Sequence, residues 1–169
     1  MIVFRCTQRV AKRFRLELVE GAPSSTGLLG DWYANFLNVG ATRLVLCLSE
    51  RTLLPVIVPA RQAEFPAHFP GYLLEILKRL GIARHVIDAE CRQAFETAFA
   101  PTRSRSLLTT HNDFAHSASL YLSRGDSLLH ASLALSEMPS KVIDFDSPQE
   151  VTRVLFAHRG GRGLTSGCI

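Results

Sequence analysis

The chain has 169 residues, of which 47% are hydrophobic and 20% are charged. This length favours one domain with its own core, and this composition excludes an intrinsically disordered chain. No apolar run reaches the ~20 residues that a membrane-spanning helix needs, so no membrane partner is expected. The formal net charge is +4. Much of the positive charge lies in residues 1–15, which contain basic residues and no acidic residue.

Residues 2–6 are predicted to form a strand, and Thr7 is a suitable N-cap for a helix that follows it. Val10 and Phe14 lie four residues apart and would face inward. The opposite face of this helix is basic, and it is either a solvated surface or a contact surface for an anionic partner. The basic residues of that face are Arg9, Lys12 and Arg13.

Residues 28–40 have the spacing of an amphipathic helix, with Asp31 as its cap and Gly40 as its C-terminal stop. Trp32, the single tryptophan, is expected to be a buried anchor in this segment. Residues 43–49 and 53–59 are predicted to pair as an antiparallel hairpin at the centre of the sheet. The interior positions of this hairpin are predicted to be Val45, Cys47, Val56 and Val58.

Helices are predicted over residues 70–81, from Ser104 or Ser106 to about residue 122, and over residues 147–156. Residues 84–93 favour a short helix, residues 94–101 favour a strand, and residues 127–139 fit a helix or a strand. Together these elements predict a single α+β domain over residues 1–156. Its sheet is expected to be small and mainly antiparallel, with a central hairpin packed by several helices. Residues 157–169 are expected to be a flexible, basic, glycine-rich tail.

The four cysteines are widely spaced and include no CxxC pair. Without a secretory signal, this spacing favours reduced thiols and a cytoplasmic location. Four segments of the chain, in order, resemble a family of small bacterial proteins that carry a domain of unknown function. These segments are "FRCTQRVAKRF", "LGDWYANFL", "RLVLCLSERTLLPVIVPA" and "SRSLLTTHNDFAH". The resemblance covers residues 2–156 and implies a stand-alone cytoplasmic domain with no established activity; His111 departs from the family's pattern.

The stretch "RSRSLLTTHNDFAH", residues 103–116, is the main candidate for a polar site. His111 and His116 would diverge by about 140° on a helix and are unsuited to share a metal, so no metal or cofactor is expected. An arginine beside Asp113 would lower the pKa of that carboxyl and make it a poor general base. The favoured interpretation is structural, with Asp113 paired to Arg105 or Arg43.

The sequence contains no glycine-rich phosphate loop, no GxSxG motif and no HExxH motif, and whether the chain is an enzyme stays open. The preferred function is a non-catalytic binding or interaction module, with a protein or a nucleic acid as possible partner. The alternative is a nucleic-acid binder or hydrolase that uses the basic N-terminal helix and residues 103–113. The candidate polar cluster consists of Trp32, Asn35, Arg103, Arg105, Asn112 and Asp113.

Overall fold

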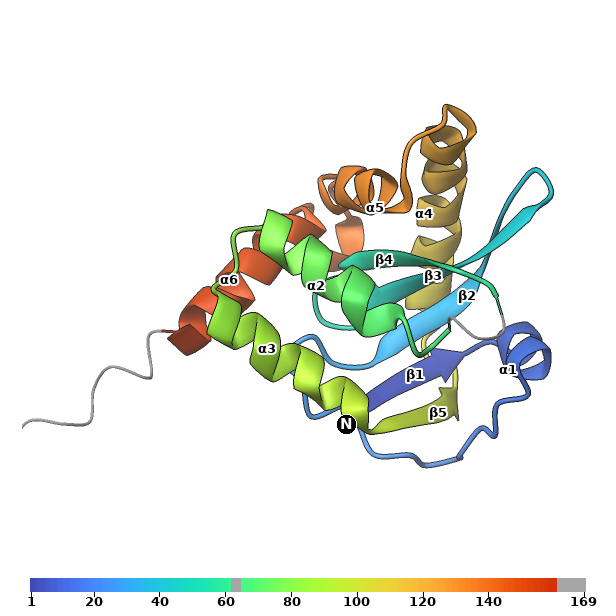
Figure 1. Cartoon of the computed structure of the whole chain (residues 1–169), viewed down its shortest axis with the longest axis horizontal. Coiled ribbons are helices and arrows are strands. Elements are labelled where there is room, and N and C mark those ends of the chain that lie inside the picture. The colour runs from blue at the N-terminus through green and yellow to red at the C-terminus, as the bar shows by residue number, and fades with distance from the viewer. Residues whose placement is uncertain (62–64, 161–169) are drawn as a thin grey trace, which may run out of the picture.

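The computed structural model describes residues 1–61 and 65–160, in which one five-stranded sheet carries helices on both faces (Figure 1). The strands are β1 (Ile2–Cys6), β2 (Trp32–Val39), β3 (Thr42–Ser49), β4 (Pro55–Pro59) and β5 (Thr97–Pro101). The helices are α1 (Gln8–Phe14), α2 (Phe69–Arg79), α3 (Arg84–Arg92), α4 (Arg105–Ser123), α5 (Leu128–Ser136) and α6 (Pro148–Gly160). Two short 3-10 helices are η1 (Gln93–Phe95) and η2 (Lys141–Ile143). The α+β prediction is confirmed.

The sheet is mixed, with the strand order β4-β3-β2-β1-β5. β3 pairs antiparallel with β2 and β4, which confirms the predicted hairpin. β1 lies parallel to both of its neighbours, β2 and β5. The connection from β1 to β2 contains helix α1, and a parallel pair requires a long crossover of this kind. The expectation of a mainly antiparallel sheet with a central hairpin is therefore corrected in two respects. Two of the four described strand pairings are parallel, and β4 is an edge strand, so the hairpin occupies one side of the sheet.

The helix predicted over residues 28–40 is wrong, because most of this segment is strand β2. Trp32 and Ala34 are buried in the core on one face of the sheet, and Tyr33 and Leu37 are buried on the other. A strand buried on both faces lacks the alternation of apolar and polar residues that identifies a strand. The spacing of its apolar residues therefore also fitted the apolar face of a helix. Gly40 does not end a helix; it adopts a φ of +55° in the tight turn to β3.

Helices α1, α2 and α3 cover one face of the sheet, and α4 and α5 cover the other (Figure 1). The hairpin positions that were predicted to be interior are fully buried, and they face the α2 side. Trp32 lies in the same core with its ring edge against Phe69, at a centroid distance of 4.7 Å. The predicted burial of Trp32 is therefore confirmed, although this residue belongs to a strand and not to a helix.

Helix α4 begins as expected, since the Ser104 Oγ accepts a hydrogen bond from the Leu107 amide at 3.3 Å. The segments left open in the sequence are resolved as helices α3 and α5 and strand β5. Helix α6 continues through residue 160, and the rest of the expected tail, residues 161–169, lies outside the described residues. None of the described helices is both long and apolar enough to cross a membrane.

Candidate functional site

A group of paired charges lies where β1 meets the start of β2. We call Arg5, Asp31, Glu50 and Arg103 the arginine–carboxylate cluster. Because Phe4 and Cys6 belong to the core on the α2 side, strand alternation turns Arg5 to the opposite face. The Arg5 Nε donates a hydrogen bond to the Asp31 Oδ2 at 2.8 Å, and the two residues are only 4% and 0% exposed. A buried ion pair of this kind is retained only where both charges find partners.

Asp31 is surrounded by donors, and the cluster extends from Asp31 to the surface. The Ser25 amide donates to the Asp31 Oδ1 at 2.7 Å, and the Arg103 Nη2 lies 3.3 Å from the Oδ2. The same Arg103 nitrogen donates to the Glu50 Oε1 at 2.9 Å. The Arg103 side chain is 48% exposed and that of Glu50 is 28% exposed. The cluster therefore has a buried pair inside and a screened pair outside.

Tyr33 lies beside Arg5, since the β1–β2 register pairs these two residues. Its hydroxyl is buried near Arg103 but has no well-aligned hydrogen-bond partner. Burial raises the pKa of the Tyr33 hydroxyl, and the neighbouring positive charge of Arg103 opposes the rise. The hydroxyl therefore stays protonated at neutral pH and is available as a donor.

Helix α1 presents a second charged surface, on the other side of the sheet. Val10 and Phe14 are buried, which leaves the basic side chains of the helix in solvent. The ring centroids of Phe14 and Phe36 lie 6.1 Å apart, and the Arg43 Cζ lies 5.1 Å from the Phe36 ring centroid. Arg43 therefore belongs to the same surface. We call this surface the basic face; its residues are Arg9, Lys12, Arg13, Arg15 and Arg43. Within residues 1–61 and 65–160, no carboxylate forms an ion pair with any of them.

Asn35 fixes the start of α1. Thr7 is the N-cap residue, as predicted, but its side chain does not cap the helix. Its hydroxyl instead donates to the Asn35 Oδ1 at 3.0 Å, and the same oxygen accepts a hydrogen bond from the Phe36 amide at 2.8 Å. Asn35 thus joins β2 to the first residue before the basic helix, which is a structural role.

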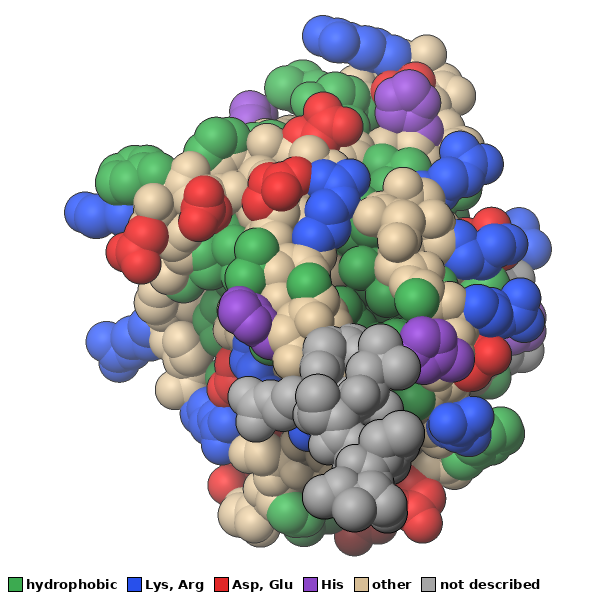
Figure 2. Space-filling view, turned by 90° about the vertical axis from the view of Figure 1, so that its left-hand side faces the viewer, with side chains coloured by type: hydrophobic (Ala, Val, Ile, Leu, Met, Phe, Trp, Pro, Cys, Tyr) green, Lys and Arg blue, Asp and Glu red, His purple; other side chains and the backbone are tan. Residues whose placement is uncertain are grey.

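The end of the molecule that lies opposite α1 carries both signs of charge. Figure 2 looks at the end farthest from α1 in Figure 1 and shows Lys and Arg side chains interspersed with Asp and Glu. Helices α2 and α3 also carry local ion pairs, Lys78–Glu75 at 3.0 Å and Arg84–Asp88 at 2.9 Å. The cations of α1 have no such partners among the described residues, so the positive charge of the basic face is not neutralised locally.

The residues of the predicted polar cluster do not converge. Arg105, Asn112 and Asp113 are exposed on α4, whereas Trp32 is buried on the opposite face of the sheet. The expected pairing of Asp113 with Arg105 or Arg43 is wrong, since no ion pair of Asp113 occurs in the described part of the chain. The inward-facing Phe114 turns its neighbour Asp113 toward solvent, about 100° around the helix axis. Of the predicted residues, only Arg103 belongs to the arginine–carboxylate cluster.

His111 is the most deeply buried polar residue of this stretch, followed by Thr110. His111 is 1% exposed, and its Nε2 lies 2.8 Å from the Leu46 carbonyl oxygen of β3. Burial lowers the pKa of His111, so the ring is neutral at neutral pH. His111 therefore joins α4 to the sheet and is not accessible to a substrate in solution.

The described thiols are protonated, which makes them unsuited to nucleophilic catalysis and to metal binding. Burial raises the pKa of Cys6 to about 12 and that of Cys91 to about 11, and it raises the pKa of Cys47 well above the ordinary value. A protonated thiol is a poor nucleophile and a poor metal ligand. The described residues also contain no group of three or more His, Cys, Asp and Glu side chains placed to hold a metal ion.

A shallow groove lies between α2 and α5. Its volume is about 490 Å³, and Tyr72 and Leu129 supply much of its apolar lining, with His68 and Glu75 among its polar residues. The lining of the groove includes no residue of either charged feature, and its residues include one carboxylate, Glu75, and no lysine or arginine.

Comparison with known proteins places the chain in an uncharacterised group. A family model described as a domain of unknown function (DUF6933) matches residues 3–151. No curated protein matches the chain. The match covers most of the chain and confirms the resemblance to a domain-of-unknown-function family that the four sequence segments indicated.

Proposed function

The chain belongs to the DUF6933 family, and we propose that it is a non-catalytic binding module whose partner is a nucleic acid. The observation that carries the proposal is the basic face, whose cations are exposed and lack a carboxylate partner among the described residues. Double-stranded DNA carries about one negative charge per 1.7 Å of its axis, so a compact group of cations can contact several phosphates at once.

Two elements combine to form this surface. Helix α1 supplies Arg9, Lys12 and Arg13, and the turn between β2 and β3 brings Arg43 beside them through Phe36. Contacts of this kind address the phosphate backbone and carry no base information. The proposal is therefore sequence-independent binding, with a strong dependence on salt concentration.

Several side chains of the types that support catalysis are buried or protonated in this structure. The described thiols are protonated, His111 is buried and neutral, and Asp31 is enclosed by its donors. These features support a binding role over a hydrolytic one. Reduced thiols also agree with a cytoplasmic location in a bacterial cell, which forms part of the proposal.

The experiment is fluorescence anisotropy with a labelled random 20-mer, as RNA and as DNA, against three forms of the full chain. The test variant carries Arg9→Gln, Lys12→Gln and Arg13→Gln on α1. The control variant carries Arg79→Gln, Arg84→Gln and Arg92→Gln on α2 and α3, which removes the same charge from exposed positions. The parent is expected to bind with a Kd of about 1–100 μM, the range of non-specific binding.

We expect the test variant to lose at least about tenfold in affinity and the control to stay within about twofold. Equal losses in the two variants would mean that only net charge matters, and the basic face would then have no special role. Competition by polyglutamate as effective as that by the nucleic acid would assign an acidic protein as the partner and overturn the nucleic-acid proposal.

A further inference from the structure

Two donors in the arginine–carboxylate cluster are buried without an acceptor. They are the Nη2 of Arg5 and the hydroxyl of Tyr33, which lie on paired positions of β1 and β2. Most buried polar atoms in proteins have a partner, and an exception calls for a specific explanation. Among the described residues three such atoms occur; two of them, in Arg5 and Tyr33, are neighbours and both are donors, and the third is the Nδ1 of His111 on α4.

The outer end of the cluster is the ion pair between Arg103 and Glu50. The guanidinium groups of Arg5 and Arg103 both contact the Asp31 Oδ2, at 2.8 Å and 3.3 Å, so they lie side by side. Tyr33 is the register partner of Arg5 on the neighbouring strand. Glu50 occupies the outer guanidinium, Arg103, at 2.9 Å. A carboxylate from the chain itself thus occupies the exposed guanidinium that shares Asp31 with Arg5.

The surroundings of Tyr33 contain strained backbone. Leu53 adopts a φ of 58°, and the consecutive residues Asp144 and Phe145 adopt φ values of 54° and 64°. Residues other than glycine rarely adopt this left-handed conformation, and such strain often marks binding sites. Ile143, adjacent to the second strained pair, packs against Tyr33, Leu53 and Leu107. Two separate strained segments therefore meet at the same small cluster.

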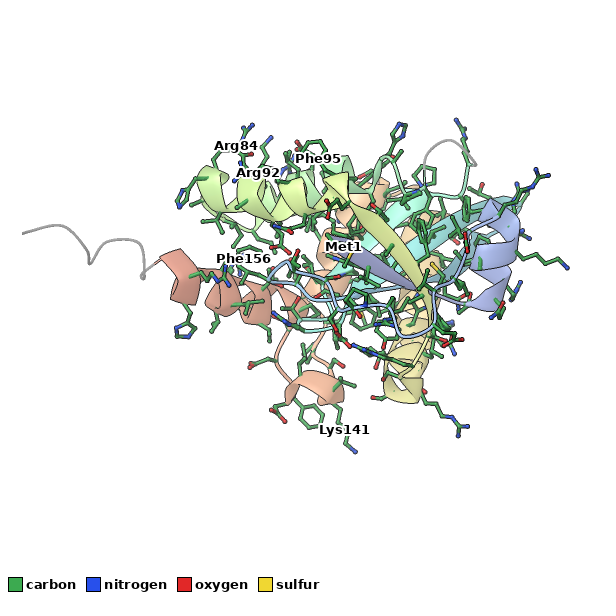
Figure 3. The ribbon with its side chains drawn as sticks, turned by 90° about the horizontal axis from the view of Figure 1, so that it is seen from below. Met1, Arg84, Arg92, Phe95, Lys141 and Phe156 are labelled. Atoms are coloured by element: carbon green, nitrogen blue, oxygen red, sulfur yellow. The ribbon has the colours of Figure 1, made fainter. Side chains whose placement is uncertain are left out.

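One strained segment carries exposed apolar side chains. Phe145 is 70% exposed, and Val142 is exposed in the same short segment. Figure 3 shows the segment that carries Lys141 projecting on the same side of the sheet as α4, opposite to α3 with its labelled Arg84 and Arg92. An aromatic side chain held in solvent by strained backbone is more costly than a polar one at the same place.

From this geometry we propose that Arg5, Tyr33 and Arg103 form an oxyanion-binding subsite at which Glu50 is the built-in occupant. The ligand group is a carboxylate or a phosphate that replaces Glu50 on Arg103 and accepts hydrogen bonds from the free Arg5 nitrogen and from the Tyr33 hydroxyl. The guanidinium fork suits both groups, because each offers two oxygens in one plane. This subsite lies on the opposite face of the sheet from α1 and goes beyond the proposed function.

The test is thermal melting of the full chain, followed by Trp32 fluorescence, in sodium phosphate, sodium acetate or sodium chloride at equal ionic strength. A ligand that binds only the folded state raises the melting temperature. We expect phosphate or acetate to raise the melting temperature above that in chloride. An effect of phosphate alone assigns a phosphate ligand, and an effect of acetate alone assigns a carboxylate ligand.

Two variants separate the subsite from a general salt effect. Glu50→Gln removes the competing carboxylate. It is expected to lower the half-effect concentration, which is the anion concentration that gives half of the maximal rise in melting temperature, by about two- to fivefold. This factor corresponds to the loss of an exposed ion pair. Glu150→Gln removes the partner of Arg153 on α6 and is expected to leave that concentration unchanged. The α1 charge variant described above is also expected to keep the response, which separates the subsite from the basic face.

The side-chain Nε resonance of Arg5 provides a readout that does not depend on stability. It is expected to shift during the phosphate or acetate titration in the parent and to stay in place in Arg103→Gln. Should Arg103→Gln fail to fold, Arg103→Lys, which keeps the charge but loses the fork, is expected to respond at a higher anion concentration. Identical melting in all three salts, or an unchanged half-effect concentration in Glu50→Gln, would overturn the subsite.

Discussion

Arg5 and Arg9 are four residues apart in the sequence, yet they belong to opposite kinds of surface. Arg5 is buried in strand β1 and paired with Asp31 at 2.8 Å, whereas Arg9 is exposed on α1 with no ion pair among the described residues. Arg103, half-exposed and bound to two carboxylates, is intermediate between them. The same side chain therefore fixes the fold in one place and is free to meet a partner in the other.

The difference follows from where each arginine falls in its element. The pleat of β1 turns Arg5 toward the α4 side of the sheet, where it pairs with Asp31, which also accepts a hydrogen bond from the Ser25 amide. The short helix α1 buries Val10 and Phe14, so Arg9 and Arg13 point outward. Buried charges contribute to stability only as pairs, while exposed unpaired charges contribute chiefly to long-range attraction.

The largest effect is expected at Asp31. Asp31→Ala leaves Arg5 buried without its counter-charge, which should lower the free energy of unfolding by about 3–5 kcal/mol. Urea denaturation measures this loss. The matched control is Asp88→Ala, which removes the partner of the exposed Arg84 and should change stability far less. Equal losses in the two variants would erase the contrast between buried and exposed pairs.

The outer pair should give a smaller effect. A double-mutant cycle with Glu50→Gln and Arg103→Gln is expected to yield a coupling energy of about 0.2–1 kcal/mol, because solvent screens the half-exposed guanidinium. Urea denaturation of the two single variants and the double variant provides the cycle. A coupling energy of several kcal/mol would show that the Arg103–Glu50 pair behaves as a buried pair, as the Arg5–Asp31 pair does.

His111 extends the comparison to a buried group that carries no charge. Because its pKa in the folded state lies below the unfolded value near 6.5, the unfolded chain binds the proton more readily. Stability should therefore fall as the pH drops from about 6.5 through the folded pKa. Melting between pH 7 and pH 5 should show this loss, and His111→Gln should reduce the slope. A variant with an unchanged slope would assign the pH dependence to another group.

The smallest effect on stability is expected at the basic face. The variant with Arg9→Gln, Lys12→Gln and Arg13→Gln removes exposed cations that have no ion-pair partner in the described chain. Its melting temperature should match that of the parent within experimental error, or rise slightly as mutual repulsion is relieved. A clear drop in melting temperature would mean that these side chains hold the fold and are not free for a partner.

Much of the architecture was predictable from local patterns. The Ser104 cap of α4, the hairpin of β3 and β4 and the apolar stripe of α2 all follow from short-range rules. β2 was misassigned because it is buried on both faces, so it shows no polar alternation. The position of β1 between β2 and β5 depends on pairings distant in sequence, which no local pattern encodes.

The arginine–carboxylate cluster was largely missed, and its signals in the sequence were weak. Arg5 is a single charge inside the apolar run "IVFRC", and Asp31 is a single acid inside "LLGDWY", which suits a buried pair as well as a helix cap. Their partnership joins residues 26 positions apart through the parallel contact of β1 and β2. The part of the basic face on α1 was predictable, because a helix with few residues facing inward must expose the rest. The addition of Arg43 was not, because it depends on the contact of this residue with Phe36.

The salt dependence of nucleic-acid binding tests the central claim most directly, because it counts the phosphate contacts that the basic face makes. Anisotropy titrations between 50 and 200 mM salt give the slope of log K against log salt for the parent, the α1 variant and the α2–α3 control. We predict that the slope becomes shallower by about one unit for each contacting cation removed from α1, and that it stays unchanged in the control. The same slope in the parent and in the α1 variant would contradict the account, because it would mean that the basic face contacts no phosphate.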